Sequence, residues 1–388
     1  MESLDVAIVG AGIGGLSAAI AIREAGHEVH VYERAPNLLP IGAGICLWPN
    51  GGRALAALGI VDALEEVSPT LRTLRYLDRE GNEVRTYSLE ALTARVGQRS
   101  YPLARYDLHD ALLDRLGRDR VTLDSECVGV SQDENAVVVD FKDGRSVRAD
   151  LLVGADGVRS VIRSHVVAEP TKLGPYYMSS FGLVPASLAL TASDTFTFYV
   201  SENKRVGLLD VGRGRLYYFI DSPIDPSAPV SETGDQRGDL REHFAGWCPD
   251  VQTLIDAIDP AAPRQPIGDF DALDTYFKGR IVLLGDAAHA TTPLLGQGAA
   301  MGLEDSLVLG RHLATSPSLE TALAGYDAER RPRAASVVLA ARARMQAMLG
   351  VVPEAAAEWY RKLVDDESAQ DFIDKQVEIA ETAPALTY

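Results

Sequence analysis

Glycines near the start of the chain have the spacing that could hold the phosphates of a dinucleotide. They follow the apolar run Val6 to Val9 and precede the apolar run Leu16 to Ile22, which predicts a strand-to-helix turn. Gly10 permits a tight turn, Gly12 lets the backbone approach a pyrophosphate, and Gly15 lets the helix pack closely on the strand. The N-terminus of that helix then faces the phosphates. The candidate cofactor contacts here are Gly10, Gly12, Gly14 and Gly15.

A second strand, predicted over Glu28 to Tyr32, ends at an acidic residue. Glu33 lies where the carboxylate of a dinucleotide-binding unit accepts hydrogen bonds from the adenosine ribose. Arg34 beside it could cover the adenine. The glycine turn, the helix, the second strand and the terminal acid occur in the expected order, which strengthens a motif that is weak by itself.

A late glycine-bearing segment, from Gly285 to Gly298, could hold the other end of the same ligand. Gly298 precedes an apolar helical pattern. The positive end of that helix could stabilise a reduced, anionic flavin ring. The two segments together predict FAD, with one segment at each end of the cofactor.

Composition and charge exclude several classes of protein. Of the 388 residues, 46% are hydrophobic and 24% charged, which is ordinary for a globular protein of about two domains. The net charge of −18 argues against nucleic acid or an anionic membrane as a partner. The apolar stretch near the start lacks a basic leader, so we expect a cytoplasmic protein. The cysteines form no C-x-x-C pair and the histidines show no ligand spacing, so neither disulfides nor a metal are expected.

The elements that must position these residues predict an α/β fold with a Rossmann-type FAD-binding domain, an inserted antiparallel-sheet substrate domain and a helical C-terminus. The boundaries predicted from the pattern are 1–175 for the first part of the FAD-binding domain, 176–270 for the substrate domain and 271–388 for the second part with the C-terminal helices. Within the first part, a helix is predicted over 50–67. Strands at 121–123, 127–131 and 136–141 are predicted to form a β-meander.

Three motifs in order resemble those of the single-component, FAD-dependent aromatic hydroxylases, the p-hydroxybenzoate hydroxylase-like family. They are the early glycine motif, Asp156-Gly157, and the segment Gly285-Asp286-Ala287-Ala288-His289. The resemblance covers nearly the whole chain. It implies that NADH or NADPH reduces FAD, and that O₂ then forms a flavin C4a-hydroperoxide that hydroxylates an electron-rich ring. The chain has no second dinucleotide motif, so the nicotinamide would bind transiently, as it does in this family.

The same resemblance assigns further residues to the cofactor. Asp286 would bind the ribityl chain, Arg105 would pack near the flavin, and Asp156 would lie where the pyrophosphate and the nicotinamide meet. Arg105 could equally be a surface residue, and Asp156 could be a simple turn residue. Pro293 would lie beside the isoalloxazine. The remaining FAD-binding candidates are Cys46, Val128, Gly296, Gln297, Gly298 and Ala299.

Within the family, stretches such as Trp48-Pro49-Asn50-Gly51, Lys204-Arg205-Val206 and Thr291-Thr292-Pro293 resemble those of the bacterial FAD-dependent urate hydroxylases. The resemblance implies urate as the substrate and 5-hydroxyisourate as the product. The resemblance makes Arg205 the group that holds the anionic purine and Tyr217 a pocket-lining aromatic. One departure is Ser179-Ser180-Phe181-Gly182, where that group tends to carry Asn-Trp-Asn-Gly. Another anionic ring, such as a hydroxynicotinate-like or salicylate-like acid, is thus the alternative substrate.

Other functions remain open at this stage. The same fold could host a reductase or epoxidase of isoprenoids, although Arg205 and the acidic composition disfavour it. A non-hydroxylating flavin reductase or a non-catalytic flavin-binding protein is a further alternative. His289 could be catalytic or a structural hydrogen-bonding group, and the protein could be a monomer or a homodimer.

Overall fold

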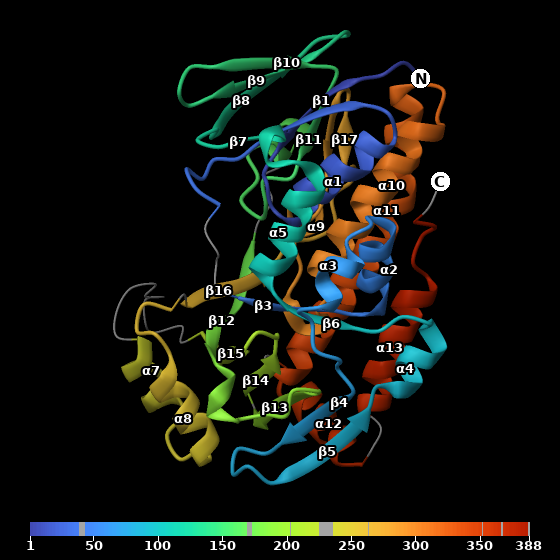
Figure 1. Cartoon of the computed structure of the whole chain (residues 1–388). Coiled ribbons are helices and arrows are strands. Elements are labelled where there is room, and N and C mark those ends of the chain that lie inside the picture. Colours follow the sequence, from blue (N-terminus) through green and yellow to red (C-terminus); the bar gives the residue numbers. More distant parts are fainter. Residues whose placement is uncertain are drawn as a thin grey trace.

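The computed structural model describes residues 1–38, 43–168, 173–201, 203–224, 236–262, 264–350, 352–365 and 368–386. Figure 1 shows two sheet regions stacked along the long axis of the molecule. The helices α10 (Gly298–Thr315) and α11 (Leu319–Met348) run beside them. We call the two regions the upper and the lower region, as they appear in this view.

The upper region is built on a mostly parallel sheet with the strand order β17-β18-β11-β1-β2-β7. Its central strands are continuous apolar runs because both faces of the sheet are covered. The edge strand β17 is antiparallel to β18. The strands are β1 (Asp5–Val9), β2 (Glu28–Tyr32), β7 (Val121–Thr122), β11 (Leu151–Gly154), β17 (Phe277–Lys278) and β18 (Ile281–Leu283).

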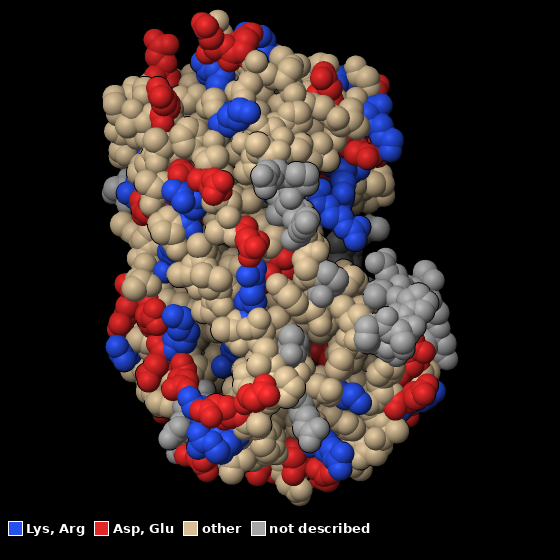
Figure 2. Space-filling view, turned by 180° about the vertical axis from the view of Figure 1, so that it is seen from behind, with Lys and Arg blue, Asp and Glu red and all other residues tan. Residues whose placement is uncertain are grey.

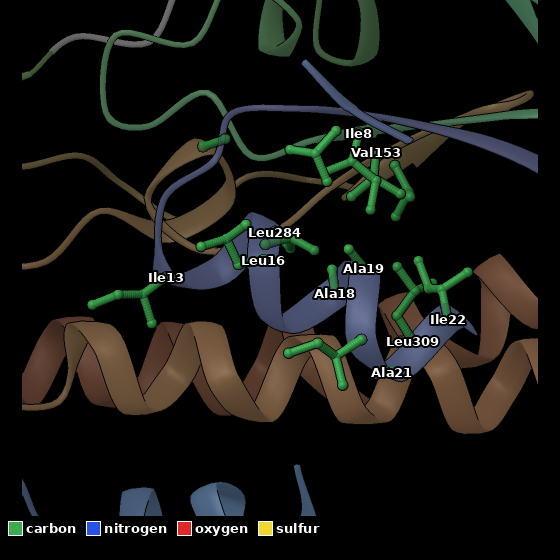
Figure 3. Close-up of a cluster of buried hydrophobic side chains, with 14 of the residues drawn as sticks. Ile8, Ile13, Leu16, Ala18, Ala19, Ala21, Ile22, Val153, Leu284 and Leu309 are labelled. Carbon is green, nitrogen blue, oxygen red and sulfur yellow. The ribbon is translucent and has the colours of Figure 1, made fainter. Parts of the chain in front are cut away.

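Helix α1 (Ile13–Glu24) lies between this sheet and α10. Figure 3 shows Leu16 of α1 beside Leu284, and Ala21 and Ile22 close to Leu309 of α10. The two helices can approach closely because Gly310 has no side chain. A Cβ at this position would lie only 2.9 Å from the carbonyl oxygen of Ala21. This packing brings the early glycine turn next to α10.

A small antiparallel sheet, in the order β10-β9-β8, lies above the main sheet (Figure 1). The predicted β-meander is only partly correct. Residues 121–122 form β7, which pairs in parallel with β2 in the main sheet, because Val31 and Tyr32 offer it a free edge. The small sheet consists of β8 (Cys127–Gln132), β9 (Val137–Phe141) and β10 (Ser146–Ala149).

The lower region contains a sheet with the order β16-β12-β15-β14-β13-β4-β5. Strands β4 and β5 come from a part of the chain that the predicted boundaries assign to the FAD-binding domain. β4 joins through a parallel pairing with β13, so the sheet is not purely antiparallel. The strands are β4 (Thr73–Leu77), β5 (Glu83–Ser88), β12 (Gly174–Pro185), β13 (Thr195–Ser201), β14 (Lys204–Asp210), β15 (Arg215–Pro223) and β16 (Arg264–Asp269).

Alternate side chains of the lower sheet face opposite sides. One set packs against α7 (Gln236–His243) and α8 (Pro249–Ala257). The other set is turned towards α11, α12 (Pro353–Val364) and α13 (Ser368–Glu381). We call the second side the inner face. It carries Tyr76, Tyr177, Ser179, Phe198, Arg205, Tyr217, Phe219 and Asp221.

The connecting elements cover the junction between the two regions. The predicted helix over 50–67 is divided into α2 and α3, because Gly59 adopts a left-handed conformation with φ of +68° that ends the first helix. These elements are α2 (Pro49–Ala57), α3 (Val61–Glu65), α4 (Glu90–Val96), α5 (Arg105–Leu116), α6 (Arg163–Val166), α9 (Asp286–His289) and the hairpin of β3 (Gly44–Leu47) and β6 (Tyr101–Ala104).

Acidic and basic side chains alternate over the face shown in Figure 2, despite the net charge of −18. In the described part of the chain, no single helix is long and apolar enough to cross a membrane.

Candidate active site

The early glycine turn has the shape that a pyrophosphate requires. Gly10 has a φ of +106°, and a Cβ there would overlap the carbonyl of Ala155. A Cβ at Gly15 would overlap the carbonyl of Gly10, so this glycine serves the packing of helix on strand. Gly12 differs, because no heavy atom lies within 4 Å of the position of its Cβ. The backbone at Gly12 is therefore open to a ligand, next to the first N–H groups of α1.

Glu33 stands at the end of β2, beside this turn. Its Oε2 accepts a hydrogen bond from the N–H of Ala11 at 2.8 Å, and its Oε1 accepts one from the N–H of Ala35 at 2.9 Å. His109 of α5 contacts the same turn through the carbonyl oxygen of Ala11 at 2.7 Å. Arg34 is exposed next to Glu33. The carboxylate of Glu33, which is predicted to bind the ribose, is thus held beside the turn by the backbone N–H groups of Ala11 and Ala35.

The structure brings the early and late glycine segments together, although about 270 residues separate them. The position of a Cβ on Gly302 lies 3.7 Å from the Cα atoms of both Gly14 and Gly285. The hydroxyl of Ser306 donates to the carbonyl oxygen of Gly14 at 3.0 Å. A single extended ligand can therefore contact both segments, as predicted for FAD.

The late segment presents exposed groups on a buried framework. Asp286 is exposed as the first residue of α9, and Pro293 is exposed in a short 3₁₀ turn. Gln297 is buried and its amide binds Asn50 and Gln376, at 3.2 and 2.8 Å. Gly296, with a φ of +65°, lies against the indole of Trp48. Gly298 and Ala299 open the first turn of α10, where backbone N–H groups lack helical partners.

A buried charge network supports this segment. Asp305 accepts hydrogen bonds from the N–H of Gly285 at 2.9 Å and from His289 at 2.5 Å. Burial disfavours the charged imidazole, but the Asp305 carboxylate outweighs burial and raises the pKa of His289. Arg330 binds Asp305 at 2.6 Å and Glu304 at 2.8 Å. The hydrogen bond between the His289 ring and Asp305 therefore favours a structural role for His289 over a catalytic one.

The remaining FAD candidates lie in different surroundings. The carboxylate of Asp156 accepts hydrogen bonds from Ser160 at 2.5 Å and from the N–H of Val161 at 2.7 Å, while its backbone lies next to Gly10. Arg105 is exposed at the start of α5. Cys46 is buried in β3, and burial raises the pKa of its thiol. Val128 is exposed on the small sheet.

Arg205 lies on the inner face of the lower sheet in a buried ion pair. Its Nε and Nη2 donate to Oδ2 of Asp221 at 2.9 and 2.5 Å. The other oxygen of Asp221 accepts from the hydroxyl of Ser179 at 2.7 Å. The guanidinium lies 4.5 Å from the ring centroid of Phe219. Arg205 is thus fixed in place and largely neutralised by groups that were not predicted.

Tyr217 connects the lower sheet to the upper region. Its ring packs on Gly44 of β3 so closely that a Cβ at Gly44 would overlap it. Burial, together with the Asp221 carboxylate, raises the pKa of Tyr217, so the phenol is protonated at neutral pH and can donate a hydrogen bond. The structure places Tyr217 and Arg205 on the same face, in neighbouring strands.

The sequence pattern missed several groups on this face. Asp221 follows Phe219 at the two-residue spacing of a strand, so alternation from Tyr217 could have found it. Tyr177 has a buried hydroxyl that has no hydrogen-bond partner within the described ranges. In the segment Ser179 to Gly182, only Ser179 and Phe181 belong to the inner face, since Ser180 and Gly182 lie on the side of Tyr218.

The fold and the early glycine turn are those of a protein that binds FAD. The profile of the family described as FAD binding domain matches residues 3–341, and the chain belongs to this family. The predicted family and the predicted FAD cofactor are thereby confirmed.

The similarity extends to particular enzymes. The chain is 39% identical to the FAD-dependent urate hydroxylase of Klebsiella pneumoniae over 362 residues, which is 92% of this chain and 94% of that protein. It is 39% identical to the enzyme of the same name from Mycolicibacterium vanbaalenii over 370 residues, or 94% and 93% of the two chains. The solved structure of Klebsiella pneumoniae HpxO complexed with FAD and uric acid matches with a TM-score of 0.93 and 36% identity, over 98% and 97% of the chains. This agreement confirms the predicted fold class.

A substitution of Gly12 tests whether the early glycine turn binds the FAD pyrophosphate. We expect Gly12→Ala to fold normally but to bind FAD about tenfold more weakly, or about 1.4 kcal/mol, because the new methyl group enters the open space above the turn. Titration of apoprotein with FAD, followed by fluorescence, measures the affinity. Gly174→Ala on β12 of the lower sheet is the matched control, since its Cβ would meet only the Tyr176 side chain at 3.6 Å or more. Unchanged affinity in Gly12→Ala would place the pyrophosphate elsewhere.

Proposed function

We propose that this protein is an FAD-dependent urate hydroxylase that uses NADH or NADPH and O₂ to convert urate to 5-hydroxyisourate. The observation that carries the proposal is the match, over 98% of the chain, to HpxO complexed with FAD and uric acid. One oxygen atom of O₂ would enter the substrate at C5, and the other would leave as water with the electrons of the nicotinamide. The bound FAD supplies the acceptor for those electrons and the activation of O₂.

The proposed FAD contacts are those predicted from the sequence, and the geometry supports them. Gly10, Gly12 and the first turn of α1 would hold the pyrophosphate, with Glu33 at the ribose. Asp286 and the N-terminus of α10 would hold the ribityl and ring end. Arg34, Cys46, Arg105, Val128 and Asp156 stay proposals on the resemblance alone.

On the substrate side, the chain's own residues would bind and orient a planar anion. Arg205 presents a guanidinium whose position is fixed by Asp221 and Phe219. Tyr217 supplies a neutral phenol donor from the neighbouring strand. Oriented binding and exclusion of water are what the protein must add to the chemistry of the cofactor.

The alternative substrate is another anionic ring, such as 6-hydroxynicotinate or salicylate. It is favoured by one observation, that Ser179 and Phe181 take inner-face positions in the segment that departs from the urate-hydroxylase pattern. We further propose that the enzyme acts in the cytoplasm as a monomer or homodimer. The net charge of −18 argues against binding to an anionic membrane.

Turnover with three candidate substrates tests the proposal. We expect urate to accelerate NADH or NADPH oxidation by the purified holoprotein, with O₂ consumed, little H₂O₂ formed and 5-hydroxyisourate detected. 6-Hydroxynicotinate and salicylate serve as comparison compounds. If one of these compounds accelerated NADH or NADPH oxidation and gave a hydroxylated product, and urate did neither, that compound and not urate would be the substrate. Stimulation with only H₂O₂ as product would contradict hydroxylation of that compound.

A further inference from the structure

Arg344 of α11 reaches the inner face of the lower sheet from the opposite side. Its Nη2 lies 3.4 Å from the hydroxyl of Tyr76, and its guanidinium carbon lies 4.5 Å from the ring centroid of Phe372. Tyr76 stacks on Phe198, with 5.1 Å between ring centroids. Phe198 in turn contacts Phe219, the ring beneath Arg205. A continuous aromatic surface therefore connects the two guanidinium groups.

Arg344 forms no ion pair with the described residues, and the carboxylate that acts on it, Asp371, is not in contact. No carboxylate among them lies within 4.0 Å of its guanidinium, and its Nε is buried without an acceptor. The other arginines in the buried part of α11 behave differently, because Arg330 and Arg333 bind Glu304, and Arg342 binds Asp269. Burial lowers the pKa of Arg344, and the positive charge of Arg205 acts in the same direction, while Tyr76 and the Asp371 carboxylate oppose part of this shift.

Arg344 is partly exposed, but its Nε is buried, and a guanidinium in this position without an ion pair is costly, because proteins normally pair such groups. Arginine stays protonated under these conditions. The Arg205–Asp221 pair carries no net charge, whereas the guanidinium of Arg344 has no carboxylate in contact among the described residues. An anionic ring that lies on the aromatic surface would remove this penalty, because it would supply the missing counter-ion.

We propose that Arg344 is a second substrate-binding residue, which pairs with the anionic edge of the planar ring and selects anionic over neutral rings. The inference rests on the proposed function and deepens it by dividing the work between two arginines. Arg205 is a rigid, neutralised hydrogen-bonding group that sets orientation. Arg344 supplies the charge that makes binding depend on the ionisation of the substrate.

Three variants of the holoenzyme test this division: Arg344→Gln, Arg344→Lys and the control Arg361→Gln. Arg361 is exposed on α12, so its substitution changes the net charge equally without touching the inner face. Urate dissociation constants come from the change in flavin absorbance, and KM and kcat from NADH oxidation. We expect Arg344→Gln to raise the urate Kd and KM about tenfold or more. Arg344→Lys should recover part of the loss, and Arg361→Gln should match the wild type.

Stability separates a binding role from a structural one. Because Arg344 forms no ion pair with the described residues, Arg344→Gln should keep the FAD content of the wild type, and its substrate-free melting temperature should be unchanged or higher. Urate should then stabilise the wild type more than this variant. A lower melting temperature with loss of FAD, or equal urate affinity in Arg344→Gln and Arg361→Gln, would overturn the inference.

Failure of the proposed function gives a different result. If the wild type does not bind urate, the urate proposal is wrong, and the same variants are titrated with salicylate and its neutral counterpart salicylamide. A preference for salicylate that disappears in Arg344→Gln would support the role of Arg344. A wild type that binds both compounds equally, or binds neither, would overturn it.

Discussion

Replacing Arg330 with methionine is expected to lower the free energy of unfolding by about 3–5 kcal/mol, and to weaken FAD retention as well. The Arg330 side chain is fully buried and binds Asp305 at 2.6 Å and Glu304 at 2.8 Å. Methionine has a similar length but no charge, so the variant leaves two buried carboxylates with fewer partners. Denaturant unfolding at neutral pH measures the loss.

The effect on FAD follows from what those carboxylates hold. Asp305 fixes the N–H of Gly285, the residue before Asp286. Glu304 accepts a hydrogen bond from Asn50, which also donates to Gln297 at 2.9 Å. Arg330 thus positions both parts of the late glycine segment without contacting the proposed cofactor site itself. It is a positioning residue.

A matched change elsewhere controls for loss of charge. Arg361→Met on the exposed surface of α12 should alter stability by no more than about 0.5 kcal/mol. If Arg330→Met were as stable as this control, the network would be dispensable. If Arg330→Met were destabilised but retained wild-type affinity for FAD, the coupling between the network and the late segment would be contradicted.

Local patterns predicted the parts of the site that local chemistry determines. The early turn could be read because Gly10, Gly12 and Gly15 serve a motif only a few residues long, and the second strand follows at once in the chain. The late segment could be interpreted in the same way, since Gly298 precedes a helical segment rich in apolar residues. The sequence predicted that both segments bind one FAD, but it could not give the contacts between them, because contacts such as Ser306 to Gly14 span most of the chain.

The sequence could not give the pairing of distant segments. Nothing near β4 signals that it lies parallel to β13, and this pairing is what places Tyr76 on the inner face. Residues 121–122 resemble the start of a meander, yet they form β7 and pair in parallel with the free edge of β2. Arg344 looks like any basic residue of an amphipathic helix until the structure shows that its neighbours on α11 have carboxylate partners.

The pairing of Arg205 with Asp221 changes what its substitution should do. From the sequence, loss of Arg205 would weaken only substrate binding. In the structure, Arg205→Met would leave Asp221, which is 1% exposed, as an unpaired buried charge, so we expect the free energy of unfolding to fall by about 3–5 kcal/mol. Substrate affinity should fall as well, and the single variant cannot separate the two effects.

A double variant separates them. In Arg205→Met combined with Asp221→Asn, the amide oxygen can still accept the hydrogen bond of Ser179, and both charges of the pair are removed together. We expect this variant to recover most of the lost stability while binding urate as weakly as the single variant does. Denaturant unfolding and urate titration of the two holoproteins give both quantities. Recovery of urate binding together with stability would mean that Arg205 only neutralises Asp221, and that the anion is held by other groups on the inner face.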